Sequence, residues 1–266
     1  MQRLFPAPAA AGAPAPASAT ADLTTLDGLA DAYAYPQLRP GTPWLRANMV
    51  SSLDGAARHD GRSQPLSSDG DMRVFGVLRA LADAVVVGAE TVRQEGYRPA
   101  RAREDFRARR AAAGQGPAPA VAVVSSALDL DFSLPLFTEP LTPTLVLTGA
   151  DAPADRVTAA EKAGALVVVA GEGTRVDPAR AVRELAARGL TRLLAEGGPR
   201  LLAQFAAAGA LDELCLTLAP LVTAGDAMRI MHGPGPGLTE PERFTPVAIL
   251  EEDGFLFTRY ARHTGG

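Results

Sequence analysis

Short apolar runs and helix-period segments alternate along most of the chain. Continuous apolar runs that end in Gly, Ser or Thr are typical of strands buried on both faces, whereas apolar residues spaced by three and four indicate amphipathic helices. The pattern predicts strands at 44–52, 84–88, 120–125, 144–148, 165–170 and 192–195, and helices at 69–82, 154–163, 178–188 and 199–208. This alternation predicts an α/β fold with a mostly parallel central sheet flanked by helices.

The C-terminal part of the chain carries strand and turn signals only. Strands are predicted at 214–219, 247–251 and 256–261, so we expect a strand-rich C-terminus. Residues 97–119 are rich in Arg and Ala, and their pattern is compatible with either a short helix or a loop.

The N-terminal region differs in composition from the rest. Residues 1–21 are mostly Ala, Pro, Gly, Ser and Thr and lack the 7–15-residue apolar core of a signal peptide. We predict a disordered tail at 1–21, a lead-in segment at 22–43 and a single domain at 44–266. No apolar stretch approaches the roughly 18 to 20 residues that a membrane helix needs, so a cytoplasmic protein is expected.

Composition narrows the possible chemistry. The 266 residues carry a net charge of −4, and no basic run is interleaved with aromatic residues, which argues against nucleic-acid binding. Lys162 is the single lysine, so a bound anion would meet arginines or backbone N–H groups. One cysteine, Cys215, and three scattered histidines do not form a metal-binding motif, and no metal is expected.

The strongest local signal is a strand followed by an acidic residue, two glycines and a proline. The residues concerned are Glu196, Gly197, Gly198 and Pro199, and the helical pattern then continues through Arg200 and Leu201. Glycines allow a ligand to approach the backbone closely, Pro suits a first helical turn, and the N–H groups of a helix start attract phosphate. A strand-to-helix turn without a ligand explains the same spacing equally well, but a carboxylate at the end of a buried strand needs a partner.

Two other predicted strands end in comparable residues. Gly88 ends one strand and Thr91 follows in the first turn of a helix, where its hydroxyl could bind phosphate or cap the helix. Ser126 lies just after another strand. Because ligands of open α/β sheets bind at the carboxyl ends of strands, these residues would together form a dinucleotide groove.

Polar residues also mark the first predicted strand and the helix after it. Asn48 lies within the strand, and Asp54 belongs to an Asp-Gly pair that is typical of a turn. Arg79, near the end of the 69–82 helix, could form a surface ion pair or receive an anion.

In this order, segments 48–55, 78–92, 196–202 and 211–220 resemble the reductase half of the bifunctional deaminase/reductases of riboflavin synthesis, and more closely the standalone actinobacterial-type reductases. The resemblance covers about residues 44–262. It implies a dihydrofolate-reductase-like fold, a homodimer, and hydride transfer from NADPH to the ribose C1′ of 5-amino-6-(5-phosphoribosylamino)uracil, a small phosphorylated pyrimidine. No zinc-deaminase motif is present, so deamination would take place on another polypeptide.

The resemblance also assigns roles to individual residues. It implies substrate contacts at Ser63, Arg79 and Glu196, and cofactor contacts at Thr91, Ser126 and the helix start 198–204, which includes Gly198, Pro199, Arg200 and Leu201. The strand ends add Gly88 and Gly197 to the predicted cofactor residues. Asn48 would lie near the reacting carbon. The proton donor could be Asp54, Glu196 or water.

Three features depart from the family pattern. Pro65 stands where many members have Trp, and Gln94-Glu95-Gly96-Tyr97 replaces an acidic pair followed by Pro. The substrate arginine of the next loop has three candidates, Arg98, Arg101 and Arg103. Two alternatives therefore stand beside the pyrimidine reductase: a reductase of the same fold that acts on a pteridine such as dihydrofolate, and a non-catalytic NADP(H)-binding protein.

Overall fold

A computed structural model describes residues 1–6, 21–233 and 238–263. Its strands are β1 (Gln2–Phe5), β2 (Trp44–Ser51), β3 (Ala84–Gly88), β4 (Ala120–Val124), β5 (Leu145–Thr148), β6 (Leu166–Val169), β7 (Arg192–Ala195), β8 (Glu213–Leu218), β9 (Phe244–Glu252) and β10 (Phe255–Arg262). Its α-helices are α1 (Leu26–Ala32), α2 (Asp69–Leu81), α3 (Ala89–Glu95), α4 (Arg107–Ala112), α5 (Pro135–Thr138), α6 (Ala154–Lys162), α7 (Pro178–Ala186) and α8 (Pro199–Ala207), and 3-10 turns span Gln64–Leu66 and Glu104–Phe106.

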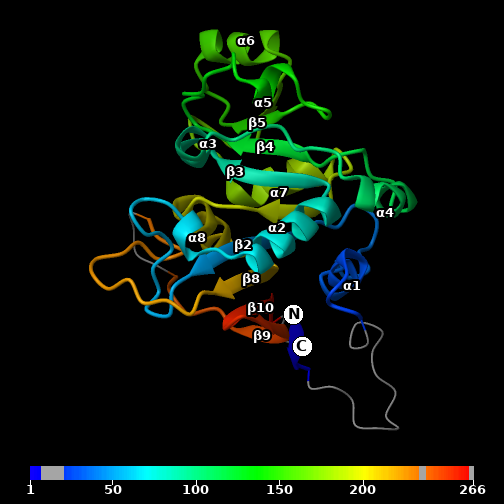
Figure 1. The fold of residues 1–266 in the computed structure, drawn as a ribbon. Helices are drawn as coiled ribbons and strands as arrows, with labels where there is room; N and C mark the ends of the chain where they lie inside the picture. The colour runs from blue at the N-terminus through cyan, green and yellow to red at the C-terminus, as the bar shows by residue number, and fades with distance from the viewer. Residues whose placement is uncertain (7–20, 234–237, 264–266) are drawn as a thin grey trace.

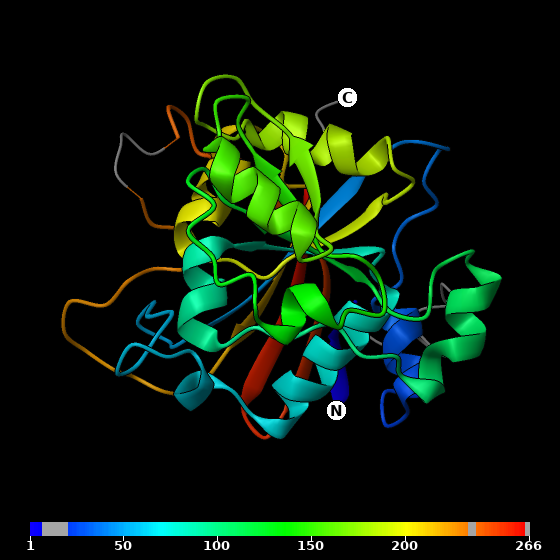
Figure 2. The ribbon, with the colours of Figure 1, turned by 90° about the horizontal axis from the view of Figure 1, so that it is seen from above.

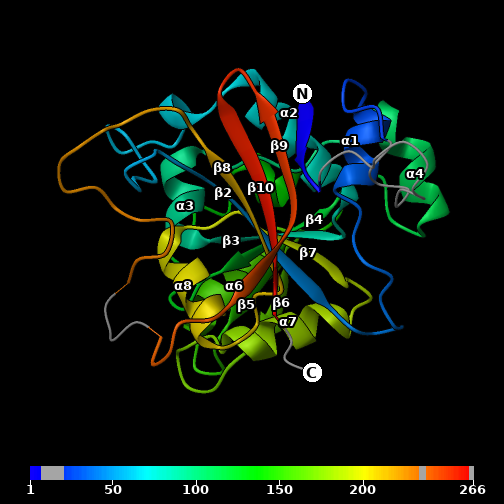
Figure 3. The same cartoon turned by 90° about the horizontal axis from the view of Figure 1, so that it is seen from below.

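One twisted sheet runs through the whole molecule, in the order β1-β9-β10-β8-β2-β7-β3-β4-β5-β6 (Figure 1). The strands from β8 through β2 to β6 are parallel to their neighbours. β10, β9 and β1 complete the sheet in antiparallel pairing, with β1 beside β9 near the N-terminus (Figure 3). The parallel strands bring their carboxyl ends to one edge, where a ligand site is expected.

Helices cover both faces of the parallel strands, as the view from above shows (Figure 2). Strand residues alternate between the faces: Leu193 and Ala195 of β7 pack with α7 and α8, whereas Leu194 packs with α1 and α2. Helices α3, α5 and α6 join a third apolar cluster with β3, β4 and β5. Because both faces are buried, these strands are continuously apolar, which is the pattern seen in the sequence.

The structure confirms the predicted α/β class, the mostly parallel sheet with flanking helices and the strand-rich C-terminus. The ends of the predicted elements fall within one to three residues of the observed ones. The undecided stretch 97–119 contains loops, a 3-10 turn and the short helix α4.

Two expectations for the N-terminal region need correction. Gln2–Phe5 is not part of a disordered tail but forms edge strand β1, and the Met1 amino group pairs with Glu252 at 3.2 Å. The predicted tail at 7–20 lies outside the described residues. The lead-in segment contains α1, whose Leu29 and Ala30 are buried in the core, so it is part of the domain.

A buried ionic network fixes the end of α1 to the sheet. Glu213 of β8 accepts hydrogen bonds from Arg46 at 2.9 Å and from Arg259 at 2.7 Å. Arg46 also donates to the carbonyl of Tyr33, just after α1, at 2.7 Å. Arg259 donates to the carbonyl of Ala32, the last residue of α1. Burial alone would raise the pKa of Glu213, but the two guanidinium groups lower it to about 2. The carboxylate therefore stays charged, and the network has a structural role away from the carboxyl edge.

Among the described residues, the helices are too short or too polar to cross a membrane.

Candidate active site

A cleft of about 610 Å³ opens at the carboxyl ends of β2, β7 and β3. It brings together six of the residues that the sequence predicts for the site: Asn48, Ser63, Thr91, Glu196, Gly198 and Pro199. The side chain of Asn48 makes no hydrogen bond to any residue in the part of the chain that the structure describes, so its amide remains available to a ligand. Ser63 lies half-buried at the start of the 3-10 turn Gln64–Leu66.

Glu196, directly after β7, forms a bidentate ion pair with Arg79 of α2. The Nε atom of Arg79 donates to Oε1 at 2.7 Å, and its Nη2 donates to Oε2 at 2.5 Å. The hydroxyl of Tyr97 also donates to Oε2 and accepts a hydrogen bond from Arg79 Nη2 at 2.8 Å. The guanidinium lies between two rings, 4.5 Å from the centroid of Phe75 and 5.2 Å from that of Tyr97. Arg79 is thus neither a simple surface residue nor a free anion receptor, but part of a polar cluster beside the cleft.

Burial and the opposite charge of the partner both shift the pKa values of this pair. Only 5% of the Glu196 side chain is exposed. Desolvation raises the pKa of Glu196 above its ordinary value, although the Arg79 charge and hydrogen bonds lower it in part. Burial would lower the pKa of Arg79, but the Glu196 carboxylate outweighs burial and raises it. Glu196 is therefore a carboxyl group that takes up a proton more readily than an exposed one.

The Gly197-Gly198 pair forms a close backbone cradle before α8. Gly88 donates its backbone N–H to the Gly197 carbonyl at 2.9 Å, which joins the end of β3 to the end of β7. A Cβ atom at Gly198 would lie 2.7 Å from the Thr91 hydroxyl and 3.9 Å from a guanidinium nitrogen of Arg58. A side chain at Gly198 would therefore press on Thr91, and its absence leaves the backbone at the start of α8 open to a ligand.

The remaining predicted cofactor residues differ in where they lie. Arg200 is exposed and pairs with Glu90 at 3.3 Å, whereas the Leu201 side chain is buried in the core and leaves only its backbone for a ligand. Ser126 is exposed just after β4 but does not line the cleft. A ligand that reached both Gly198 and Ser126 would have to extend across the ends of β7, β3 and β4.

Asp54 occupies a different environment from Glu196. Its carboxylate accepts hydrogen bonds from the Ser52 hydroxyl at 2.5 Å and from the backbone N–H groups of Ala224 at 2.6 Å and Thr223 at 3.2 Å. The Ser52 hydrogen bond and the two backbone donors lower the pKa of Asp54 to about 2. It is therefore ionised at neutral pH and joins two loops, which disfavours a role as proton donor.

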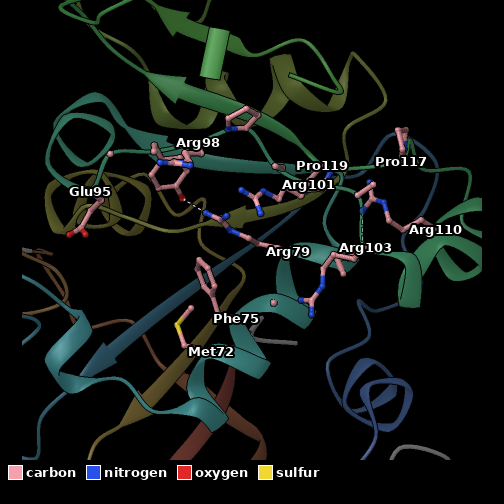
Figure 4. A pocket seen from close by; sticks show the side chains of 17 residues that line it. Met72, Phe75, Arg79, Glu95, Arg98, Arg101, Arg103, Arg110, Pro117 and Pro119 are labelled. Atoms are coloured by element: carbon pink, nitrogen blue, oxygen red, sulfur yellow. Dashed lines mark hydrogen bonds between the residues drawn. The ribbon is translucent and has the colours of Figure 1, made fainter. Parts of the chain in front are cut away.

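A second cavity of about 620 Å³ lies beside the cleft and is rich in arginine (Figure 4). We call it the arginine cavity; its charged residues are Arg79, Arg98, Arg101, Arg103, Arg110 and Glu95. Arg110 is committed to three backbone carbonyls, and Arg103 packs over the ring of Phe106 and against Gly76. Arg98 and Arg101 are exposed and have no carboxylate partner among the residues that the structure describes. They are the candidates best placed to meet an incoming anion.

Three residues of the site were not predicted from the sequence: Tyr97, Phe75 and Arg58. Tyr97 and Phe75 line both cavities and contact Arg79, and Arg58 lies against the glycine cradle. Tyr97 had a weak signal, since it follows Gly96 in the segment that departs from the family pattern. Arg58 and Phe75 had none, because their positions depend on how a loop and a helix pack in three dimensions.

The fold and the site together define a class of protein. A parallel sheet with a glycine cradle at a helix start, a buried carboxyl group and an adjoining cationic cavity is typical of an α/β enzyme that binds a dinucleotide and a small anionic substrate. The family model of the RibD C-terminal domain matches residues 43–247, and the chain belongs to this family.

Two curated relatives are archaeal reductases. Over 194 residues the chain is 30% identical to the 2,5-diamino-6-ribosylamino-4(3H)-pyrimidinone 5′-phosphate reductase of Methanothermobacter thermautotrophicus, covering 73% of this chain and 85% of the relative. It is 28% identical over 184 residues to the reductase of the same name from Archaeoglobus fulgidus, covering 69% of this chain and 83% of the relative.

Solved structures agree with this assignment. A pyrimidine reductase-like protein from Corynebacterium diphtheriae superposes with a TM-score of 0.75 at 27% identity, covering 87% of this chain and 98% of that one. RibD from Acinetobacter baumannii gives a TM-score of 0.66 at 18% identity, covering 84% of this chain and 59% of that one, and supports the fold alone. The predicted riboflavin-pathway reductase family is confirmed.

Proposed function

We propose that this chain is an NADPH-dependent reductase that converts a ribosylaminopyrimidine 5′-phosphate, 5-amino-6-(5-phosphoribosylamino)uracil or its diaminopyrimidinone counterpart, to the ribitylamino product. The observation that carries the proposal is the place of buried Glu196 between the glycine cradle and the arginine cavity. The names of the two archaeal relatives support the diaminopyrimidinone form of the substrate.

The residues at the carboxyl edge fit a dinucleotide. A Cβ at Gly198 would clash with the Thr91 hydroxyl, so the backbone before α8 stays bare, and the start of α8 presents N–H groups that favour phosphate. Arg58 adds positive charge beside this cradle. Gly88, Thr91, Ser126 and the segment Gly197, Gly198, Pro199, Arg200 and Leu201 would hold the cofactor, with Arg200 and Leu201 contributing through backbone groups. When bound, NADPH supplies the hydride.

The substrate side of the cleft must position the opened sugar and deliver a proton. Opening of the ribosylamine ring breaks the bond between C1′ and O4′, moves a proton from nitrogen to O4′ and leaves a C=N bond. Addition of hydride at C1′ and of a proton at nitrogen completes the reduction. Glu196 would be the proton donor because burial raises its pKa, and Asn48, which lines the same cleft, would orient the reacting part of the sugar.

The phosphate of the substrate fits the arginine cavity. Figure 4 shows the side chains of Arg79 and Arg101 extending into it. Because Arg79 already pairs with Glu196, a phosphate would be attracted mainly by Arg98 or Arg101. Arg79 would lie between this phosphate and Glu196. Ser63, which lines the cleft, would contact the substrate there.

The test is a comparison of substrates with purified protein and NADPH, followed by loss of NADPH absorbance. We expect kcat/KM for one of the two ribosylaminopyrimidine phosphates to exceed that for dihydrofolate by at least about 10³-fold, because a site built for polar groups rejects analogues that leave them unpaired. The dephosphorylated substrate should lose most of this activity. Preference for dihydrofolate would refute the proposal, and NADPH binding without reduction of any substrate would indicate a non-catalytic protein.

Assembly as a homodimer and a location in the cytoplasm stay predictions. Analytical ultracentrifugation of the purified chain would test the first of them.

A further inference from the structure

Tyr97 stands where the cleft and the arginine cavity meet. Its side chain lines both, whereas Arg79 lines only the arginine cavity and Glu196 only the cleft. The residue thus borders the space assigned to the reacting sugar and the space assigned to the phosphate.

The local backbone directs Tyr97 to this place. Helix α3 ends at Gly96, whose φ of +61° is left-handed and is readily adopted only by glycine among common residues. The Tyr97 N–H then bonds to the Val92 carbonyl at 3.2 Å, which ties the start of the loop back to the helix. The tyrosine is therefore held by a helix end and not by a free loop.

The hydroxyl of Tyr97 uses both of its hydrogen-bonding functions in the polar cluster. It donates to Glu196 Oε2 and accepts from Arg79 Nη2 at 2.8 Å, while its ring lies 5.2 Å from the Arg79 guanidinium. Oε2 thus has two donors, Arg79 and Tyr97, and Oε1 has Arg79 alone. Donation to a carboxylate favours its charged form, so the phenol influences when Glu196 takes up a proton.

We propose that Tyr97 is a positioning residue that holds the Glu196 carboxyl group against Arg79. It thereby connects the loop that carries Arg98 and Arg101 to the part of the cleft where Glu196 lies. It acts through Glu196 and Arg79 and does not itself transfer the proton. The proposal rests on the proposed function in giving Glu196 a role in reduction.

The test compares Tyr97→Phe with Tyr35→Phe. Both changes keep an aromatic ring over an arginine and remove one hydroxyl: Tyr35 lies 4.2 Å from the Arg46 guanidinium and donates to the Leu193 carbonyl at 3.1 Å, away from both cavities. For Tyr97→Phe we expect kcat to fall about 10-fold with little change in KM for NADPH, since a hydrogen bond to a charged group is lost. The fall in activity with rising pH, which reports the pKa of Glu196, should move to higher pH. Tyr35→Phe should alter neither.

A second readout does not depend on activity. In protein labelled with ¹³C at glutamate carboxyl groups, the Glu196 signal is assigned by its absence in Glu196→Gln and titrated by NMR. Its midpoint should rise in Tyr97→Phe and stay at the wild-type value in Tyr35→Phe, because of these two tyrosines only Tyr97 donates to the Glu196 carboxylate.

The outcomes separate the two proposals. If the wild type reduces none of the substrates, the proposed function fails, and the NMR midpoint alone decides whether Tyr97 controls Glu196. If the wild type is active and Tyr97→Phe has an unchanged pH limb and midpoint, the positioning role is wrong. Equal losses of activity and melting temperature in both tyrosine variants would also overturn it, because they would show a general effect on stability.

Discussion

At the scale of single residues, the two carboxyl groups considered for proton transfer differ in their surroundings. Glu196 is buried next to one arginine, and its pKa is raised, whereas exposed Asp54 accepts bonds from two hydroxyls and two backbone N–H groups, and its pKa is lowered to about 2. A group that must donate a proton near neutral pH needs the first environment. The structure thus favours Glu196 over Asp54, a choice that the sequence left open.

We expect Glu196→Gln to lower kcat by about 10²- to 10³-fold, the usual contribution of a general acid. The affinity for NADPH, measured by fluorescence titration, should stay within about 2-fold. Wild-type activity should fall as pH rises through the raised pKa of Glu196, and the variant should lack this limb. Glu104→Gln, a change at an exposed carboxyl group that pairs with Arg107 and lines neither cavity, is the control and should change kcat less than about 3-fold. Unchanged kcat in Glu196→Gln would remove Glu196 from the mechanism.

The same pKa shift predicts how stability depends on pH. Because the folded pKa of Glu196 lies above the unfolded value, the folded state gains stability at pH below the unfolded pKa and loses it as pH rises through the folded pKa. Denaturant titrations at several pH values should show a smaller loss over this window in Glu196→Gln. An identical pH dependence in the two proteins would mean that Glu196 has an ordinary pKa.

At the scale of elements, the join between β7 and α8 depends on the absence of a side chain at Gly198. Its backbone angles suit any residue, so the obstacle to Gly198→Ala is the Thr91 hydroxyl at 2.7 Å from the new Cβ. We expect this variant to lose about 1–3 kcal/mol of stability, the usual cost of overpacking, and to bind NADPH at least about 10-fold more weakly. Calorimetry and fluorescence titration measure the two effects.

Thr91→Ala in the same chain removes the obstructing atom, so the double variant should regain melting temperature. Its NADPH affinity should stay low, because the Thr91 hydroxyl is itself a proposed cofactor contact. Gly116→Ala, where the nearest atom is 3.8 Å away, is the control for an added methyl group. If Gly198→Ala bound NADPH as tightly as the wild type, the cradle would not be part of the cofactor site.

The elements also show which features could be predicted from the sequence. Buried strands such as β3 and β7 are continuous apolar runs, and amphipathic helices such as α7 have a clear helical period, so both could be predicted, and the ends of the strands mark residues that meet at the site. Tyr97 could not be placed, because its contacts depend on how the loop after α3 folds onto α2. Strand β1 was missed because its residues are mostly exposed and form no buried apolar run, and because its partner β9 lies about 250 positions away in the sequence.

At the scale of the whole molecule, the sheet extends well beyond the site. Strands β8, β10 and β9 separate β2, which borders the cleft, from edge strand β1. β1 covers the backbone edge of β9, and the Met1 amino group pairs with Glu252, which also pairs with Arg73 of α2. The first residues of the chain therefore connect the far edge of the sheet to helix α2, which contains Arg79.

We expect removal of residues 1–6 to lower the melting temperature by roughly 2–5 °C, because losing a few edge hydrogen bonds and one partly exposed ion pair costs about 1–2 kcal/mol. Activity at 25 °C should stay within about 2-fold, since three strands lie between β1 and the cleft.

A variant with two residues added before Met1 keeps β1 and moves the amino group away from Glu252, so its melting temperature measures the contribution of the strand without the ion pair. If removal of residues 1–6 left the melting temperature unchanged, β1 would contribute nothing to stability. A large loss of kcat/KM with a modest fall in melting temperature would instead show that the link through Glu252 and α2 supports Arg79 and the site.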